Sequence, residues 1–520
     1  MKLNYKRTIF VGFAFFLIMA FWQAYDATIP VILTNKFGMS QGWSGVIMAL
    51  DNILAVFMLP LFGMISDKCR SKHGKRTPFI TIGTIIAAVA LLLLSVVDNS
   101  QLNNISAVAE MDSPASLAVI YDSQADAKLQ TPEGEMFVLS DLYEKEDFVE
   151  ITSQITDLKT DKLVTNPDYT NYVVPARQAY AAQQTAKNPT PLIAFVGLLF
   201  VLLVAMAVFR SPAVALMPDV TMKPLRSKAN AVINLMGTFG GILVLVLGMV
   251  FATSALKNQL MNYTVYYGVV AGIMVVALAI FLCTVREPAW AKQMQEDSVA
   301  YGIDEEKGED NSEKRKLTAS EKRSLGFILA SIILWYFGYN AVTSKYAVYA
   351  GNILNMDYNT TLLIAQGAAI VSYLPAGMLA SKIGRKKTIL GGIVLLTSAF
   401  AIASFMRSDS SVLLMNVLFA MAGIGWATIN VNSFPMVVEM CSGGDVGKYT
   451  GFYYTASMSA QIATPMLSGI LMDLDGVGMT ILFPYAALFA GLAFVTMLFV
   501  KHGDSQFAPK QGLEAFDMED

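Results

Sequence analysis

The sequence has few of the residues that build disulfide and metal sites: its 520 residues include three cysteines and two histidines. Cys69, Cys283 and Cys441 lie at or near ends of apolar segments that we place on one side of a membrane below. This excludes a disulfide-bonded scaffold on the other side. His73 and His502 lie in predicted loops, and no glycine-rich phosphate-binding loop occurs in the sequence. We therefore expect no metal, no other cofactor and no ATP hydrolysis.

Charged residues are also scarce, at 15%, whereas hydrophobic residues make up 55%. This apolar content exceeds what one soluble core would bury, and it comes in blocks of roughly 20 residues, the length of a helix that crosses about 30 Å of hydrocarbon. The first block is too long for a cleaved signal peptide. We predict an all-α integral membrane protein with twelve transmembrane helices, near residues 9–33, 43–64, 79–97, 191–210, 229–252, 264–285, 324–344, 360–380, 389–406, 412–434, 450–471 and 479–500.

Lysine and arginine gather in every second loop between these blocks. Basic loops near helix ends remain in the cytoplasm, so we predict a multi-pass protein of the cell membrane with both termini in the cytoplasm. We expect a monomer whose partners are the lipid bilayer and a small molecule, not nucleic acid. The residues that carry the orientation are Lys2, Lys6, Arg7, Lys68, Arg70, Lys72, Lys75, Arg76, Lys223, Arg226, Lys228, Lys314, Arg315, Lys316, Lys322, Arg323, Lys382, Arg385, Lys386 and Lys387.

Residues 98–190 form an acidic block, with 15 Asp and Glu against 6 Lys and Arg. The predicted topology places this block outside the cell. The run AKLQTPEGEMFVLS at 127–140 predicts a hairpin around Pro132, and VPARQAYAAQQTA at 174–186 predicts a helix. We expect a small α+β or partly disordered extracellular insertion.

Two glycine-led, cation-rich segments each separate two apolar runs: GMISDKCRSKHGKR at 63–76 and GMLASKIGRKK at 377–387. A second pair, ALMPDVTMKPLRSKAN at 215–230 and PMVVEMCSGGDVGKYT at 435–450, aligns Asp219 with Glu439. The two offsets, 314 and 220 residues, differ by about the length of the acidic block. When that block is left out, both pairs of segments are separated by nearly the same number of residues. The chain therefore reads as two copies of one unit, which predicts two pseudo-symmetric six-helix bundles. The predicted parts are an N-terminal bundle at 1–285 interrupted by 98–190, a solvated cytoplasmic linker at 286–323, a C-terminal bundle at 324–500 and a cytoplasmic tail at 501–520.

Read strictly, the twelve spans contain two internal charged residues, Asp26 and Asp51, and Arg210 lies at the inner edge of the fourth. An ionised carboxylate in hydrocarbon costs several kcal/mol, so such residues usually face a cavity or a proton path. Both lie roughly 10 to 12 Å below the outer edge at 1.5 Å per residue. Two neighbouring carboxylates in a low dielectric cannot both ionise cheaply, which predicts a shared, transferable proton. The alternatives are a solvated Asp26 and an Asp51 that only bonds Asn52.

Sites for hydroxyl-rich ligands combine aromatic faces with amides and carboxylates. Such residues cluster in predicted helices 1, 2, 7 and 10. For any one of them, interfacial aromatic anchoring or an interhelical amide bond is the alternative. The candidates are Trp22, Gln23, Tyr25, Asn52, Trp335, Tyr336, Tyr339, Asn340, Asn416, Trp426, Asn430 and Asn432.

GMISDKCRSKHGKRTPFI closely resembles the helix 2 to helix 3 signature of the major facilitator superfamily, in the extended form of the glycoside-pentoside-hexuronide:cation symporters and their sucrose-transporter-like branch. RSPAVALMPDV followed by SKANAVIN also resembles that branch. The resemblance implies the major facilitator fold, with two bundles around a central cavity and alternating access. It also implies a cytoplasmic gate, which we assign to Gly63, Asp67, Gly74, Arg76, Asp219 and Arg226, and in the second half to Gly377, Arg385 and Glu439, with Ser381 at the place of Asp67.

The chain departs from this family pattern at the coupling positions. Its fourth helix has no carboxylate, and Ala55 and Leu59 stand where melibiose-type members have carboxylates. We therefore favour proton over sodium coupling through Asp26 and Asp51.

The residues and the resemblance together predict a secondary active transporter, not an enzyme, that imports a sugar or glycoside with protons. One alternative is an efflux antiporter of amphipathic compounds. Another is a non-transporting sensor that binds its ligand through the acidic block. Deletion of residues 100–188 should spare uptake in the first case and abolish output in the last.

Overall fold

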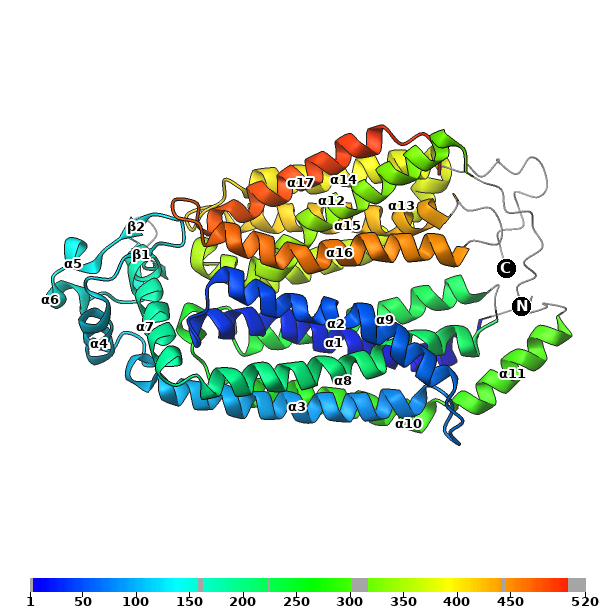
Figure 1. The fold of residues 1–520 in the computed structure, drawn as a ribbon, viewed down its shortest axis with the longest axis horizontal. Helices are drawn as coiled ribbons and strands as arrows, with labels where there is room; N and C mark the ends of the chain where they lie inside the picture. The colour runs from blue at the N-terminus through cyan, green and yellow to red at the C-terminus, as the bar shows by residue number, and fades with distance from the viewer. Residues whose placement is uncertain are drawn as a thin grey trace.

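The computed structural model describes residues 3–157, 162–222, 225–301, 317–438, 440 and 446–503. Long helices run side by side in two bundles, and a small unit lies at one end of them (Figure 1). The first bundle contains α1 (Tyr5–Asn35), α2 (Gln41–Asp67), α3 (Thr77–Asn104), α8 (Thr190–Val220), α9 (Arg226–Val250) and α10 (Thr264–Thr284). The second contains α12 (Ala319–Tyr349), α13 (Tyr358–Ile383), α14 (Arg385–Ala403), α15 (Val412–Val438), α16 (Val446–Met472) and α17 (Leu482–Leu498).

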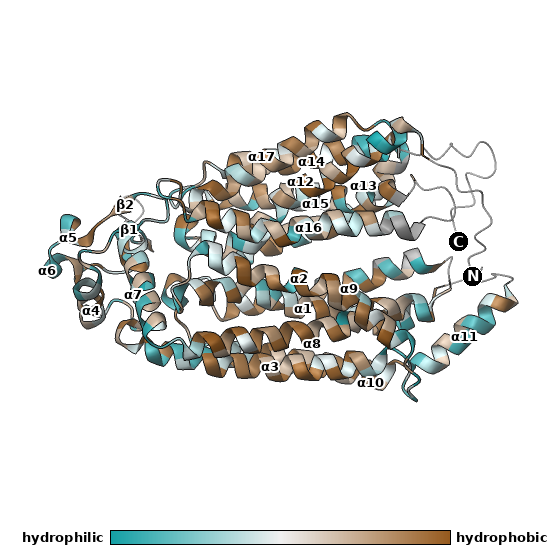
Figure 2. Ribbon diagram, viewed as in Figure 1, coloured by the Kyte–Doolittle hydropathy of each residue, from teal (hydrophilic) through white to brown (hydrophobic). Residues whose placement is uncertain are grey.

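Ten helices in the described part of the chain are long and apolar enough to cross a membrane. They are the six of the first bundle together with α12, α14, α15 and α17. α13 and α16 run beside them but are not among the ten (Figure 1). Apolar residues cover much of the length of both bundles, whereas polar residues are more frequent in the small unit and in α11 (Glu287–Ala300) (Figure 2). This pattern is the one expected of a multi-pass membrane protein.

The two bundles repeat the same set of helix contacts. α3 packs against α8 as α14 packs against α15, α1 against α9 as α12 against α16, and α3 against α10 as α14 against α17. Each bundle has a core of its own, one centred on Phe21, Leu199 and Tyr267 and the other on Trp335, Tyr346 and Phe483. Contacts between the bundles run mainly through α2 with α16 and α9 with α13.

Several helices extend beyond their predicted ends, and two of them carry buried charges there. α3 continues to Asn104 and contains Asp98, and α12 continues to Tyr349 and contains Lys345; both side chains are 0% exposed. Asp98 and Lys345 lie just beyond the predicted spans at 79–97 and 324–344, so these helices hold buried charges that the predicted bounds left out. Each extra charge is tolerated because it has a partner: Asp98 accepts a hydrogen bond from Lys36 at 2.6 Å, and Lys345 donates one to a backbone carbonyl at 2.6 Å.

The small unit follows α3 and precedes α8. It is an α+β structure with two antiparallel hairpins, β1 with β2 and β3 with β4. Leu139, Phe148, Tyr169 and Val173 lie at the centre of its apolar core. The hairpin predicted around Pro132 and the helix predicted over 174–186 are confirmed. The elements are α4 (Pro114–Gln124), β1 (Leu129–Gln130), β2 (Met136–Phe137), α5 (Leu139–Leu142), α6 (Lys145–Phe148), β3 (Gln154–Asp157), β4 (Lys162–Thr165), a π-helix (Tyr169–Val173) and α7 (Val174–Lys187).

The segment between the bundles begins with α11 (Glu287–Ala300), which lies at the opposite end from the small unit (Figure 1). The prediction of a wholly solvated linker at 286–323 is wrong for this part. Glu287 is 3% exposed and accepts hydrogen bonds from the backbone of Lys75 and Thr77, and Arg7 lies over the Trp290 ring at 4.8 Å. These contacts fix α11 to the first bundle. Residues 302–316 and the tail from 504 lie outside the described residues. Below, the two ends of the bundles are called the small-unit end and the α11 end.

Candidate functional site

The structure brings Asp26 of α1 and Asp51 of α2 together. Both side chains are partly buried, and their carboxylates are close enough to interact electrostatically. Asn52 donates a hydrogen bond to Asp51 at 2.8 Å, so the local contact considered as an alternative is present. That bond uses one oxygen of the Asp51 carboxylate, and it does not separate this carboxylate from Asp26.

A basic side chain completes this cluster. Arg210 of α8 interacts electrostatically with Asp51 and with Tyr454 of α16, and its guanidinium lies 5.6 Å from the centre of the Trp22 ring. Tyr25 interacts with both carboxylates, and its ring meets Trp22 edge to face at 5.3 Å. The sequence marks Arg210 as a charged residue, but the predicted site does not include it. Its position, as a basic residue within an apolar run, was the signal for it.

The second bundle contributes an aromatic platform. Tyr339 of α12 stacks on Trp426 of α15, with ring centres 3.6 Å apart and planes inclined by 3°. Tyr336 meets the same indole edge to face at 5.2 Å. Tyr339 also lies within electrostatic reach of Asp26. The predicted carboxylate and the predicted aromatic residues therefore come together across the two bundles.

Amides join this region to α13. Gln366 donates a hydrogen bond to Gln23 of α1 at 2.6 Å, which links the bundles directly. Tyr373 is hydrogen-bonded to Asn430 and interacts with Tyr339. Gln366 and Tyr373 were not singled out in the sequence, because an isolated amide or phenol in an apolar run has no pattern that marks it.

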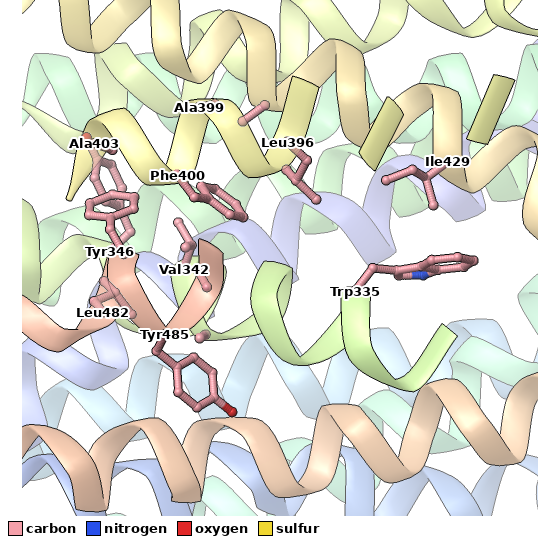
Figure 3. Packing of buried hydrophobic residues seen from close by; sticks show 14 of the residues in the cluster. Trp335, Val342, Tyr346, Leu396, Ala399, Phe400, Ala403, Ile429, Leu482 and Tyr485 are labelled. Atoms are coloured by element: carbon pink, nitrogen blue, oxygen red, sulfur yellow. The ribbon is translucent and has the colours of Figure 1, made fainter. Parts of the chain in front are cut away.

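Other predicted binding residues lie elsewhere. Trp335 is 0% exposed and packs in the core of the second bundle with Leu396 and Ile429 (Figure 3). The structure thus assigns Trp335 a packing contact. Asn432 donates to the Thr428 carbonyl of its own helix at 2.9 Å. The side-chain nitrogen of Asn340 and the side-chain oxygen of Asn416 are buried, with no partner among the described residues.

The predicted gate residues of the first half meet at the α11 end. Arg76 bonds Asp67 at the end of α2, Asp219 near the end of α8 at 2.7 Å, and the Ser66 hydroxyl. Its guanidinium also approaches the carbonyl of Gly63 at 3.5 Å. Burial alone would lower the pKa of Arg76, but its hydrogen bonds to Asp219 and Asp67 raise that pKa above the ordinary value. All these groups belong to the first bundle.

The turn before α3 needs a glycine and binds a carboxylate. Gly74 has φ of +107°, and a side chain there would meet the Glu287 carboxylate. Glu287 takes hydrogen bonds from Thr77 at the start of α3, where the helix dipole favours an anion. Arg226 instead bonds the backbone carbonyls of Pro218 and Thr221. Glu287 was not predicted, because it lies over 200 residues from its partners.

The matching residues of the second half are described only in part. Gly377 lies in α13 beside Val431, and Arg385 begins α14 after Gly384, whose φ of +94° corresponds to that of Gly74. Glu439 lies outside the described residues, and so does the side chain of Ser381.

The small-unit end is held together by contacts between the bundles. Asp473, after α16, accepts hydrogen bonds from the backbone of Gln41 and Gly42 at the start of α2, at 2.8 and 2.6 Å. Lys345 donates to the Gln41 carbonyl at 2.6 Å. Gly45 packs on the Pro465 backbone so closely that a side chain would not fit. Further bonds join Ser254 to Asp357, Thr253 to Tyr358 and Tyr358 to the Ala27 carbonyl.

Comparison with known families assigns this architecture. The family described as Major Facilitator Superfamily matches residues 179–372 and 359–516, and the family described as MFS/sugar transport protein matches residues 10–104. The chain belongs to the Major Facilitator Superfamily. This superfamily consists of membrane transporters and not of enzymes, and the resemblance seen in the motifs is confirmed.

Curated relatives match over short stretches. The chain is 30% identical over 111 residues to the MFS-type transporter ppzB of Metarhizium rileyi, 32% over 60 residues to the sucrose transport protein SUC4 of Arabidopsis thaliana, and 31% over 72 residues to the putative glycoside/cation symporter YagG of Escherichia coli. These matches cover 21%, 12% and 14% of this chain and 22%, 12% and 16% of the relatives. The chain thus matches less than a quarter of the length of each.

Solved structures share the fold over nearly the whole chain. The inward-open xylose transporter XylE of Escherichia coli aligns with a TM-score of 0.56 at 14% identity, covering 98% of both chains. A bacterial homologue of the iron transporter ferroportin aligns with a TM-score of 0.59 at 11% identity, covering 96% of this chain and 99% of that one. At these identities the likeness shows the fold alone.

Proposed function

We propose that this chain is a secondary active transporter of a sugar or glycoside, coupled to protons through Asp26 and Asp51. One observation carries the proposal: Asp26 interacts both with Asp51 of its own bundle and with Tyr339, which stacks on Trp426 in the other bundle. A proton acceptor and a flat aromatic surface thus share one place between two bundles. A site between the bundles suits alternating access, because the bundles move relative to each other around the bound solute.

Aromatic faces and amides are the groups that bind sugars. Ring C–H groups of a sugar pack on an aromatic face, and its hydroxyls bond amides and carboxylates. We assign Trp426 and Tyr339 to the first task, and Gln23, Asn52 and Asn430 to the second, with Trp22 and Tyr25 beside the carboxylates. The partial matches to a sucrose transport protein and to a putative glycoside/cation symporter support this class of substrate.

Charge balance explains how a proton could be coupled to the solute. Arg210 lies within electrostatic reach of Asp51, so protonation of the carboxylate pair weakens the attraction between the guanidinium and the pair, and loss of the proton restores it. In a site of low dielectric constant, the change in the attraction between the guanidinium and the carboxylates is large. We propose that proton binding and solute binding favour each other through this cluster. Because α8 has no carboxylate near the pair, we assign the coupling to Asp26 and Asp51.

We further propose that α13 and α16 also cross the membrane, which makes twelve spans in two six-helix bundles at 1–285 and 324–500. Their lengths of 26 and 27 residues suffice to span a bilayer. With both termini in the cytoplasm, the small unit is an extracellular insertion and the α11 end is cytoplasmic. The state described here is then closed to the outside, and the Arg76 cluster is the cytoplasmic gate in its separated form.

Uptake into proteoliposomes tests the proposal. Purified protein is reconstituted, a pH gradient is imposed, and a panel of labelled mono- and disaccharides is offered, with sodium-gradient and no-gradient vesicles as controls. We expect the pH gradient to drive accumulation of at least one sugar above its external concentration. Accumulation driven by a sodium gradient alone would show that sodium, and not the proton, is the coupling ion. Proton-driven export of amphipathic compounds without sugar uptake would favour the efflux alternative.

A further inference from the structure

The small unit is attached to the first bundle and also touches the second. It is continuous with α3 and α8, and α7 reinforces this attachment: Gln178 donates to Asn35 at 2.8 Å, and Gln101 donates to Thr185 at 2.9 Å. The unit therefore moves with the first bundle. Any contact that it makes with the second bundle spans the boundary that alternating access must open.

The β1–β2 hairpin makes such contacts at the loop between α16 and α17. Gly476 donates a backbone hydrogen bond to the Gly134 carbonyl at 2.9 Å, and Met479 donates one to the Pro132 carbonyl at 2.8 Å. The Gln130 side chain donates to the Leu474 carbonyl at 2.8 Å. Three hydrogen bonds over six residues of the loop make this a docked surface and not a single touch.

The fit at this surface depends on two glycines that face each other. Gly134 has φ of +100° and Gly478 has φ of +64°. A side chain on either would meet the backbone of the opposing segment, at Val477 and Gly478 from one side and at Glu133 and Gly134 from the other. Gly476 lies in the same loop with φ of +74°, yet a side chain there would meet open space. The loop thus offers a matched pair of positions: a side chain at Gly478 would collide with the hairpin, whereas a side chain at Gly476, whose backbone N–H bonds the hairpin, would not.

Two other links cross the same boundary. Arg407, in the loop after α14, pairs with Glu133 at the hairpin tip at 3.5 Å. Buried Arg177 of α7 donates to Gln259 at 2.7 Å, and Gln259 donates to Asn352 of the second bundle at 3.3 Å. The small unit therefore contacts the second bundle at the tip of its hairpin and, through Gln259, at its base.

We propose that the small unit is a strap across the small-unit end: it holds the two bundles together there and must release the 474–479 loop each time that end opens. The proposal rests on the alternating access proposed above. It assigns the acidic insertion a mechanical role in gating, in place of a ligand-sensing role. Removal of the strap should therefore shift the balance between the two states, even where uptake itself survives.

A reversible cross-link tests whether release is required. In a background with Cys69, Cys283 and Cys441 changed to serine, Glu133→Cys and Arg407→Cys are joined by a cleavable bismaleimide. Backbone hydrogen exchange at residues 40–47, the start of α2, reports opening without any substrate. We expect exchange there to slow roughly tenfold when the link is in place and to recover when the link is cleaved, because opening must break the docked contacts. Equal exchange with and without the link would overturn the proposal.

The glycine pair tests whether the docked surface itself holds the end closed. Ser44→Cys supplies the reporter, because Ser44 is 0% exposed where α2 meets α16. Gly478→Ala should raise the rate of maleimide labelling of this cysteine roughly fivefold or more, because the added methyl group prevents docking. Gly476→Ala, which strains the same loop without a collision, should leave it near the wild-type rate. Equal rates in both variants would contradict the strap.

Both readouts use purified protein and require neither a sugar nor a proton gradient. Failure of the proposed transport function would appear as absent uptake with the labelling difference intact. Failure of the strap would appear as normal uptake with no difference between Gly478→Ala and Gly476→Ala. If Gly478→Ala does not fold, the cross-linking experiment decides the question with wild-type glycines in place.

Discussion

Asp473, at the end of α16 in the second bundle, accepts a hydrogen bond from the backbone of Gly42, at the start of α2 in the first, at 2.6 Å. The carboxylate thus caps a helix of the other bundle. Gln41 donates to its second oxygen at 2.8 Å, so both oxygens are used. In the proposed transport cycle this cap is lost when the small-unit end opens, so its free energy would favour the closed state.

Removing this cap should favour opening of the small-unit end. Loss of a helix cap costs about 0.5 to 2 kcal/mol, so Asp473→Ala should raise the open-to-closed ratio about 2- to 30-fold. The labelling rate of Ser44→Cys measures this ratio. Asp475→Ala is the matched control, because Asp475 is exposed two residues away. A rise of the same size in both variants would show that the loop, and not the cap, matters.

Asp357 should make the stability of the fold sensitive to acid. Burial alone would raise the pKa of Asp357, but hydrogen bonds from Ser254, Thr360 and Asn359 outweigh it and hold that pKa below its ordinary value. Because the folded-state pKa is depressed, the stabilisation is present above the ordinary value of about 3.9 and is lost as the pH falls below it. Thermal unfolding in detergent should show a steeper loss of stability below about pH 4 in wild type than in Asp357→Ala.

Equal acid slopes in the two proteins would mean that the Asp357 charge adds nothing to the free energy of unfolding. Ser254→Ala provides a second check, because Ser254 donates to Asp357 from the other bundle at 2.5 Å. It should reduce the acid-dependent part without removing the charge.

Two tryptophans should have different effects. We assign Trp426, which stacks on Tyr339, to packing against a sugar ring. If that contact contributes about as much as an aromatic pair, about 0.5 to 1.5 kcal/mol, Trp426→Leu should weaken sugar affinity about 2- to 12-fold. Trp335 lies in the core, where truncation of a large aromatic residue costs about 3 to 5 kcal/mol. Trp335→Ala should therefore lower the unfolding temperature strongly. Affinity and unfolding temperature, measured on both variants, check the assignment; loss of affinity in a fully folded Trp335→Phe would contradict it.

The Arg76 cluster should govern rate more than affinity. Asp67→Asn removes one of the two carboxylates that pair with Arg76 and leaves Asp219 in place. We expect slower net transport with sugar affinity nearly unchanged, since the cluster lies at the α11 end and not beside Tyr339. Uptake rates and equilibrium binding, measured on the same preparation, separate the two quantities. A loss confined to affinity would exclude a gating role for Asp67.

The long helices could be predicted because bilayer thickness is a local constraint on each apolar run. Their ends could not, because Asp98 and Lys345 look like boundary residues until their partners are known. Lys36 lies 62 residues from Asp98, and Gln41 lies 304 residues from Lys345. Burial becomes acceptable only through these distant contacts.

Some residues of the candidate site could also be predicted from the sequence, and others could not. A carboxylate in an apolar run is conspicuous, so Asp26 and Asp51 could be named from the sequence. Trp335 could not be separated from Trp426, because both are tryptophans in apolar runs and only the packing shows that one lies in the core and the other stacks on Tyr339. Gln366, whose bond to Gln23 joins the bundles, had no local pattern at all.

We propose that Asp51, together with Asp26, couples solute movement to a proton. Exchange and accumulation, measured on the same proteoliposomes, test it most directly. Asp51→Asn should retain exchange of labelled for unlabelled sugar across the membrane at equal pH, because binding and reorientation remain, and should lose accumulation against a concentration gradient when the outside is made acidic. Accumulation by Asp51→Asn equal to that of wild type would contradict the account.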